Sequence, residues 1–404
     1  MKLSEELAWR GFFNQTTYND VSVIDGSPIS FYIGVDPSAD SMTIGNLAAI
    51  MMVKHFVNAG HRAFLLVGGA TGMIGDPDGK SDERNLKNID EINKNKAVIA
   101  SQYKSLLAGK DFTLVDNYDW FKDINYLDFL RNIGKNVPLS QMLGREFVQS
   151  RIGGEGKGLS YAEFSYALIQ AYDFLYLFQN HGVSLQLCGA DQWGNCIAGV
   201  DLIRRIEAKE ANIYSLPLII NKSTGKKFGK SEDGAVWLNP EKTSVYKFYQ
   251  FWLNVDDIGT PDYLKVYTLL DKSTIDDLVK EISDNPSARA AQKALAYEVT
   301  VMVHGKDRTE SVMRVTDVLF GKADFATLSD KDLDMLAQEI PDIKINKTIV
   351  DILTKSNLAG SNGEARRLIM NGAVSIAGEK INDNIMINSK TLIKKGKNNF
   401  VLVR

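Results

Sequence analysis

Cysteine, histidine and long apolar segments are all scarce in this sequence of 404 residues. Its two cysteines, Cys188 and Cys196, are too few for a disulfide framework and for the usual cysteine-based zinc sites. No apolar stretch approaches the roughly 20 residues of a membrane-spanning helix. Residues 1–7 contain no apolar signal core. We therefore expect a cytoplasmic protein that uses no membrane segment and holds no metal of its own.

The composition is that of a globular protein, with 44% apolar and 24% charged residues, and the length predicts two or three domains. A net charge of −3 argues against a uniformly basic nucleic-acid binder. The charge is uneven, however. Residues 344–404 contain eleven Lys/Arg and four Asp/Glu, whereas the rest of the chain contains 36 and 46. A basic tail on an acidic body predicts an appendage that binds a polyanion.

Short apolar runs alternate with longer amphipathic stretches over residues 30–220. Runs of strand length occupy 63–67, 112–115 and 184–187. This alternation predicts an α/β fold, a Rossmann-like parallel sheet with helices on both faces. Such sheets bind ligands beyond the carboxyl ends of their strands. Polar or glycine-containing segments follow the predicted strands at Asp36, 68–76, Asn117 and 189–192.

Three segments carry candidate chemistry. Residues 29–35 predict a strand, Asp36 begins a turn, and Thr43 can cap a helix whose first turn contains Gly45. A helix start of this kind binds phosphate through its N–H groups, although a glycine kept for packing explains Gly45 alone equally well. Residues 227–231 read Lys-Phe-Gly-Lys-Ser. A loop with two ammonium groups suits a polyphosphate whose charge grows during reaction, whereas a solvated turn is the alternative.

Tyr166, Gln170 and Asp173 have the spacing of one helix face, and the residues between them are mostly apolar. This helix is therefore predicted to be largely buried, and its polar groups need partners. A structural hydrogen-bond network and a ligand site both satisfy that requirement.

Together these segments resemble the class I aminoacyl-tRNA synthetases. Thr43-Ile44-Gly45-Asn46 aligns with the signature His-Ile-Gly-His, and 227–231 aligns with Lys-Met-Ser-Lys-Ser. The phenylalanine-glycine form of the second signature points to the bacterial-type tyrosyl-tRNA synthetases, which the chain resembles over nearly its whole length. Further motifs that support this resemblance lie at 68–77, 117–120, 166–173, 186–195 and 291–293.

One departure from the family pattern concerns the first signature. Both histidines are absent, and Thr43 and Asn46 stand in their places. An amide and a hydroxyl can still donate hydrogen bonds to ATP oxygens, but neither can supply an imidazolium charge.

The resemblance implies that the protein activates L-tyrosine with ATP to tyrosyl-adenylate and transfers tyrosine to the 3′ end of tRNA(Tyr). Asp173 and Tyr32 would orient the phenolic hydroxyl. Asp76, Tyr166 and Gln170 would hold the ammonium group, with Gln186 nearby. The residues implied for tyrosine are Tyr32, Asp76, Tyr166, Gln170, Asp173 and Gln186. A homodimer is also implied.

The same resemblance assigns residues to ATP. Those implied in ATP binding are Gly34, Asp36, Ser38, Gly45, Gly189, Asp191, Gln192 and Lys230, and those implied in catalysis are Thr43, Asn46, Lys80, Arg84, Lys227 and Lys230. Catalysis would consist of positioning and charge stabilisation, without a side-chain nucleophile. Mg²⁺ would arrive on the phosphates of ATP, because no carboxylate cluster has metal-ligand spacing.

We predict a catalytic domain over 1–240, a helical anticodon-side domain over 241–323, a linker over 324–343 and a small α/β module over 344–404. Residues 361–374 predict a capped helix, a glycine stop and a strand, and they resemble an RNA-binding module shared with a ribosomal small-subunit protein. The predicted RNA contacts are Arg366, Arg367, Lys394, Lys395 and Lys397.

Two other functions fit parts of the sequence. A catalytically inactive RNA-binding protein of synthetase ancestry would explain the missing histidines, but not the retained lysine loop and polar helix. A different nucleotidyl transferase would share the nucleotide-binding fold, but this function would not explain the basic tail. Pyrophosphate exchange with a panel of amino acids separates the three.

Overall fold

The computed structural model describes residues 1–77, 87–152, 158–231, 234–396 and 399–404. The chain forms two compact units. Unit 1 contains residues 1–243 and 252–299, and unit 2 contains residues 244–251 and 300–404. The helices α11 (Val245–Leu253) and α14 (Ala290–His304) therefore contribute to both. None of the helices in the described ranges is long and apolar enough to cross a membrane.

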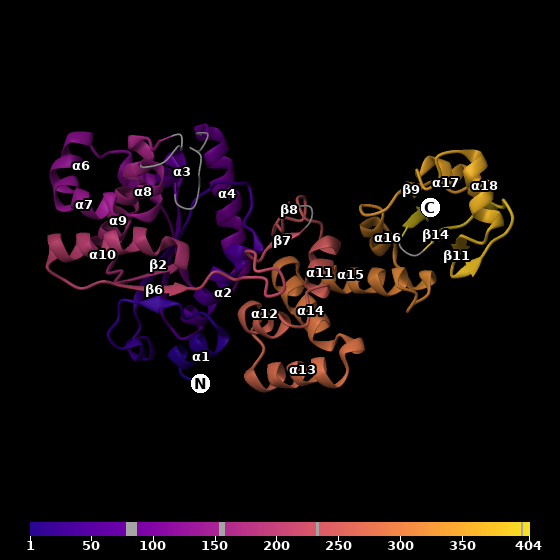
Figure 1. Cartoon of the computed structure of the whole chain (residues 1–404), viewed down its shortest axis with the longest axis horizontal. Helices are drawn as coiled ribbons and strands as arrows, with labels where there is room; N and C mark the ends of the chain where they lie inside the picture. The colour runs from indigo at the N-terminus through magenta and orange to yellow at the C-terminus, as the bar shows by residue number, and fades with distance from the viewer. Residues whose placement is uncertain (78–86, 153–157, 232–233, 397–398) are drawn as a thin grey trace. The chain divides into compact units, whose positions relative to one another are not determined.

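Unit 1 is built on a sheet with the strand order β1-β6-β5-β2-β3-β4, of which Figure 1 labels β2 and β6. The short β1 pairs antiparallel with β6, and the other neighbours pair in parallel. The parallel strands are β2 (Ser30–Val35), β3 (Arg62–Val67), β4 (Phe112–Asp116), β5 (Leu185–Gly189) and β6 (Asn212–Leu216). The predicted α/β parallel sheet is thus confirmed. Strand order reverses between β2 and β5, where such sheets bind ligands.

Helices cover both faces of this sheet. Phe31 and Tyr32 are consecutive on β2, so their side chains point to opposite faces. The Phe31 ring packs against Phe56 of α2 (Ile44–Asn58), and the Tyr32 ring packs against Phe174 of α9 (Tyr161–His181). Each ring pair has centroids 5.2 Å apart. The helices α2 and α9 therefore sandwich the strand from opposite sides.

Unit 1 contains these further elements. Its helices are α1 (Leu3–Arg10), α3 (Gly69–Ile74), α4 (Ile89–Leu106), α5 (Tyr118–Phe121), α6 (Tyr126–Asn132), α7 (Leu139–Leu143), α8 (Glu146–Ile152), α10 (Trp193–Glu207), α12 (Thr260–Tyr267) and α13 (Lys272–Asp284). Its 3-10 helices are η1 (Val21–Asp25), η2 (Gly134–Asn136), η3 (Ala190–Gln192) and η4 (Pro286–Ala288), and β7 (Lys230–Ser231) pairs with β8 (Gly234–Ala235).

Unit 2 contains a second sheet, with the order β12-β11-β14-β15-β9. Its strands are β9 (Asp342–Ile343), β11 (Val374–Ile376), β12 (Glu379–Lys380), β14 (Thr391–Lys395) and β15 (Asn399–Val403), and β10 (Lys347–Thr348) pairs with β13 (Met386–Ile387). The other elements are α15 (Lys306–Leu319), η5 (Phe325–Thr327), α16 (Asp330–Leu336), α17 (Ile349–Lys355) and α18 (Asn362–Met370). Ser361 caps α18 and Gly372 stops it before β11, as the sequence predicts.

Neighbouring residues of β14 enter different cores. Ile393 packs with residues of α17 and α18, whereas Leu392 packs with residues of α15 and α16. Leu333 and Leu336 of α16 belong to this second cluster and are buried. The segment 324–343, predicted as a linker, is therefore packed into unit 2. The compact units divide the chain at other positions than the predicted domains, and those domain boundaries stay a prediction.

Candidate active site

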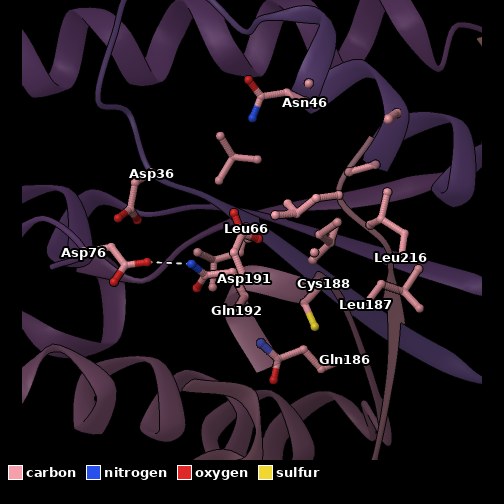
Figure 2. A pocket seen from close by; sticks show the side chains of 18 of the residues that line it. Asp36, Asn46, Leu66, Asp76, Gln186, Leu187, Cys188, Asp191, Gln192 and Leu216 are labelled. Carbon is pink, nitrogen blue, oxygen red and sulfur yellow. Dashed lines mark hydrogen bonds between the residues drawn. The ribbon is translucent and has the colours of Figure 1, made fainter. Parts of the chain in front are cut away.

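A cavity of about 350 Å³ opens at the carboxyl ends of β2 and β5 in unit 1 (Figure 2). The ends of both strands line it, together with the first turns of α2, one face of α9, η3 and the segment 216–219. The predicted tyrosine, ATP and catalytic residues that line this one cavity are Tyr32, Gly34, Asp36, Ser38, Thr43, Gly45, Asn46, Asp76, Tyr166, Gln170, Asp173, Gln186, Gly189, Asp191, Gln192 and Lys227.

Three predicted residues cannot be placed in the cavity in this way. Lys80 and Arg84 lie outside the described residues. Lys230 begins β7, but its side chain also lies outside what the structure describes. The roles assigned to all of these residues stay predictions.

The first turn of α2 is organised by Thr43 and Asn46. Thr43 is the N-cap residue, and the Asn46 carboxamide oxygen accepts from the Thr43 backbone N–H at 2.9 Å and from its hydroxyl at 3.0 Å. The two residues therefore form a capping box. Because the oxygen of Asn46 faces Thr43, its NH₂ group points toward the cavity (Figure 2).

Asp173 is buried beneath the cavity, with 2% of its surface exposed. Its two carboxylate oxygens accept from the Trp120 indole N–H at 2.9 Å and from Asn117 Nδ2 at 3.0 Å. Burial raises the pKa of Asp173 well above its ordinary value, against the lowering effect of these two hydrogen bonds. The donors hold the carboxylate in one orientation.

Two buried polar atoms beside Asp173 have no hydrogen-bond partner among the described residues: the Tyr32 hydroxyl and Gln170 Oε1. Both side chains line the cavity. Buried polar groups in folded proteins are nearly always paired, and an unpaired one costs about 1–3 kcal/mol. Unpaired groups that border a cavity are therefore candidates for binding a ligand.

A chain of hydrogen bonds connects Asp173 with Asp36. Asn117 Nδ2 also donates to Thr71 Oγ1 at 3.1 Å, and that hydroxyl donates to Asp36 Oδ1 at 2.6 Å. The Tyr166 hydroxyl donates to Asp36 Oδ2 at 2.7 Å. Thr71, Asn117 and Trp120 were not among the predicted site residues, although each lies in a quoted motif.

Gly68 is the feature of the sequence that could have indicated the role of Thr71. A Cβ atom at Gly68 would lie 2.0 Å from Thr71 Oγ1 and 2.4 Å from Asp36 Oδ1, so only glycine leaves room for their hydrogen bond. A second glycine matters at the lysine loop. Gly229 has φ +108°, and a Cβ atom there would lie 3.0 Å from Ile44 Cγ1 at the start of α2.

A second series of hydrogen bonds, made by amide side chains, begins at Asp76. Gln192 Nε2 donates to Asp76 Oδ2 at 2.5 Å (Figure 2), and Asn195 Nδ2 donates to Gln192 Oε1 at 3.2 Å. The Arg145 guanidinium donates to Asn195 Oδ1 at 2.5 Å and to the Gly194 carbonyl at 2.7 Å. Arg145 and Asn195 were not predicted as site residues.

Two contacts hold the lysine loop, the segment that begins at Lys227. The Lys227 ammonium lies 3.4 Å from Asp191 Oδ2, and both side chains are exposed. Phe228 is buried and stacks on Tyr263 of α12 with ring centroids 4.1 Å apart. Its ring also lies near Trp252 and Tyr267. Phe228 thus anchors the loop while Lys227 faces the cavity.

The predicted RNA contacts in unit 2 differ in how accessible they are. Arg366 and Arg367 are exposed on α18. The Lys394 ammonium lies 5.2 Å from the Phe400 ring centroid, and the Lys395 ammonium donates to the Leu358 carbonyl at 2.5 Å. Lys397 lies outside the described residues. The two arginines are therefore better placed for RNA phosphates than Lys395 is.

Within the described ranges, no group of three or more His, Cys, Asp or Glu side chains is placed to hold a metal ion. Cys188 and Cys196 are both buried as free thiols.

Comparisons with known proteins identify the family. The family described as tRNA synthetases class I (W and Y) matches residues 25–321, and the tyrosine–tRNA ligase SYY-like C-terminal domain matches residues 332–404. A tyrosine–tRNA ligase of Flavobacterium psychrophilum is 42% identical over 100% of this chain and 96% of its own length. Tyrosine–tRNA ligase 2 of Bacillus cereus is 41% identical, with 100% of both chains covered.

A solved structure agrees with this result. The C-terminally truncated mitochondrial tyrosyl-tRNA synthetase of Aspergillus nidulans is 30% identical, with a TM-score of 0.72 over 79% of this chain and 94% of its own. The chain therefore belongs to the class I tRNA synthetases and, within that class, to the tyrosine–tRNA ligase family.

Proposed function

We propose that this protein is an active tyrosine–tRNA ligase, which joins L-tyrosine to ATP and then transfers tyrosine to tRNA(Tyr). The observation that carries the proposal is the pair formed by the unpaired Tyr32 hydroxyl and the oriented Asp173 carboxylate beside one cavity. A phenolic hydroxyl can donate to Asp173 and accept from Tyr32. Phenylalanine would leave the Tyr32 hydroxyl unpaired and would bring no donor to Asp173, and the general cost of that disfavours it.

The amino-acid end of the substrate would meet acceptors. Tyr166 donates its proton to Asp36, so a lone pair on its oxygen remains to accept from an ammonium group. Gln170 Oε1 is an unpaired acceptor, and the Asp76 carboxylate adds a negative charge at the same cavity. Gln186 lines the cavity nearby.

In the first half-reaction, a carboxylate oxygen of tyrosine would attack the α-phosphorus of ATP, and the bond to the β-phosphate oxygen would break. Asn46 NH₂ and the N–H groups of α2 would donate to phosphate oxygens, while Lys227 and Lys230 would neutralise the departing pyrophosphate. Lys80 and Arg84 would act on the same charge. Mg²⁺ would arrive bound to the phosphates of ATP.

The nucleoside part of ATP would lie across the strand ends. Gly34, Ser38 and Gly189 line that region of the cavity, and Asp191 can accept from ribose hydroxyls. Asp191 forms an ion pair with Lys227 at the surface, and pairs of this kind contribute only about 0–1 kcal/mol. ATP can therefore break this ion pair at little cost.

In the second half-reaction, a terminal ribose hydroxyl of tRNA would attack the carbonyl carbon of tyrosyl-adenylate and release AMP. Arg366 and Arg367 on α18 would bind phosphates elsewhere on the tRNA. A reaction on tRNA during protein synthesis also favours a cytoplasmic location.

A homodimer is part of the proposal. Large apolar side chains are exposed on α6, α7, α8 and the first turn of α9. They are Tyr126, Leu127, Leu139, Ile152 and Tyr161, each more than half exposed. The Tyr126 and Tyr161 hydroxyls are 3.3 Å apart, which joins two of these elements in one surface. Exposed apolar surface of this kind suits a second copy of the chain.

Pyrophosphate exchange into ATP with a panel of amino acids tests the proposal. Exchange that depends on L-tyrosine and not on phenylalanine is expected. Equal exchange with phenylalanine would refute the assigned pocket. Absence of exchange with every amino acid, together with retained tRNA binding, would favour an inactive RNA-binding protein of synthetase ancestry.

A further inference from the structure

The hydrogen bonds that link Arg145 to Asp76 can run in only one direction. A guanidinium group donates hydrogen bonds and cannot accept them, so it requires the oxygen of Asn195 to face it. Asn195 must then direct its NH₂ group at Gln192 Oε1, and Gln192 must direct its own NH₂ group at Asp76. The Asp76 carboxylate fixes the acceptor end of this series, and Arg145 fixes its donor end at Asn195.

Burial makes this direction consequential. Asn195 is 2% exposed and Asp76 is 9% exposed, so water has little access to replace a mismatched pair. A reversed amide at Gln192 would place its oxygen beside the Asp76 carboxylate, and two acceptors would face each other in a medium of low polarity. Among the four hydrogen-bonded side chains, the guanidinium of Arg145 is the one group whose donor character cannot change.

We propose that Arg145 is a positioning residue for the ammonium group of the substrate. By setting the direction of the Asn195–Gln192 relay, it supplies a donor to Asp76 Oδ2 and holds that carboxylate as an oriented acceptor at the cavity. Arg145 itself does not line the cavity. Its effect therefore reaches the substrate through the relay, and the inference rests on the proposed function, in which Asp76 receives the ammonium group.

Equilibrium binding to the full chain tests the inference with two ligands. L-Tyrosine carries the ammonium group, and 3-(4-hydroxyphenyl)propionate has the same phenol and carboxylate but no amine. Asn195→Asp breaks the relay, because a carboxylate can only accept, so Gln192 Oε1 loses its donor and the single NH₂ group of Gln192 lies between two competing carboxylates. Arg145→Met removes the donors, whereas Arg145→Lys retains a donor.

We expect Asn195→Asp and Arg145→Met to weaken tyrosine binding by about tenfold or more and to change binding of the propionate by less than about twofold. Arg145→Lys should recover part of the tyrosine affinity. Arg204→Gln is the matched control, because Arg204 lies on the same helix as Asn195 but is exposed and paired with Asp201. It should match the wild type with both ligands.

Two results would overturn the inference. One is tyrosine affinity within about twofold of wild type in both Asn195→Asp and Arg145→Met, since about twofold corresponds to under 0.5 kcal/mol. The other is an equal loss for tyrosine and for the propionate, which would indicate general damage to the cavity. A wild-type protein that shows no tyrosine-dependent pyrophosphate exchange would instead refute the proposed function, so the two failures are distinguishable.

Discussion

The carboxamide oxygen of Asn46 is occupied by Thr43, which donates to it from both its backbone N–H and its hydroxyl. The two residues stand where the family signature has histidines. The capping box thus explains how this pair can serve the helix and the reaction together. The oxygen completes the helix terminus, and the NH₂ group stays directed at the cavity.

Replacement of Asn46 by alanine should slow tyrosyl-adenylate formation while tyrosine affinity stays close to wild type. Loss of one preorganised donor in an active site costs on the order of 10²–10³ in rate, and the partial exposure of Asn46 reduces this. Pre-steady-state adenylation measures the rate, and equilibrium dialysis measures tyrosine binding.

Asn46→Asp separates the cap from the donor, because aspartate retains the accepting oxygen but has no N–H group. If the donor matters, Asn46→Asp should be at least as slow as Asn46→Ala. Wild-type rate in Asn46→Asp would show that Asn46 acts only as a helix cap.

Lys230→Ala should slow adenylation more than Lys227→Ala does, and neither should weaken tyrosine binding much. Both charges would act on pyrophosphate, whose negative charge develops as the bond breaks. Lys227 must first leave Asp191, which reduces its net contribution. Single-turnover rate constants and tyrosine dissociation constants should be measured for both variants. A raised dissociation constant with an unchanged rate constant would contradict the assigned role.

The double variant Arg366→Gln/Arg367→Gln should bind tRNA more weakly and with less dependence on salt. Each phosphate contact that is lost should reduce the log–log salt slope by roughly 0.7–0.9. Tyrosine-dependent pyrophosphate exchange should not change, because the cavity lies in unit 1. Lys390→Gln serves as a control, since Lys390 is exposed but paired with Asp330. An unchanged salt slope in the double variant would show that α18 does not bind the RNA backbone.

Asp332 should make the stability of unit 2 depend on pH. Burial alone would raise the pKa of this carboxyl, but hydrogen bonds from Arg314, Ser311 and Ser329 outweigh it and hold the pKa well below its usual range. Because the pKa is lower in the folded state, the stabilisation is complete above the unfolded value of about 3.9 and decreases as the pH falls below it.

Asp332→Asn should therefore lower the free energy of unfolding by about 2 kcal/mol at pH 7, the size expected for charged hydrogen bonds. The difference from wild type should shrink below about pH 4. Urea unfolding at a series of pH values measures this. A difference that stays constant between neutral and acidic pH would show that Asp332 contributes through packing alone.

The position of the cavity could be predicted from the sequence because it depends on where strands end and on which residues share a helix face. Asp36 comes directly after β2 and Gly189 is the last residue of β5, and parallel strands end at one edge of their sheet. Tyr166, Gln170 and Asp173 share a helix face by their spacing alone. These residues meet because secondary structure and sheet order bring them together; the apolar pattern predicts the strands and helices, and the structure supplies the strand order.

Pairings between distant segments could not be predicted in this way. Thr71 meets Asp36 across 35 residues, and Arg145 meets Asn195 across 50. Such contacts depend on how loops and helices pack, for which periodicity carries no signal. The segment 324–343 illustrates the same limit. Its acidic composition predicts a linker, and that composition carries no signal for the packing of Leu333 and Leu336 of the capped helix α16 in a core of unit 2.

The shared carboxylate of Asp36 has a thermodynamic consequence. Tyr166 and Thr71 each occupy one of its oxygens, and Thr71 is joined through Asn117 to the Asp173 carboxylate. Under the proposed function, a shift of Asp36 toward the nucleotide would strain the groups that receive tyrosine. Occupancy of the two halves of the cavity would then be linked, and linkage is reciprocal: whatever factor the nucleotide imposed on the affinity for tyrosine, tyrosine would impose on the affinity for the nucleotide.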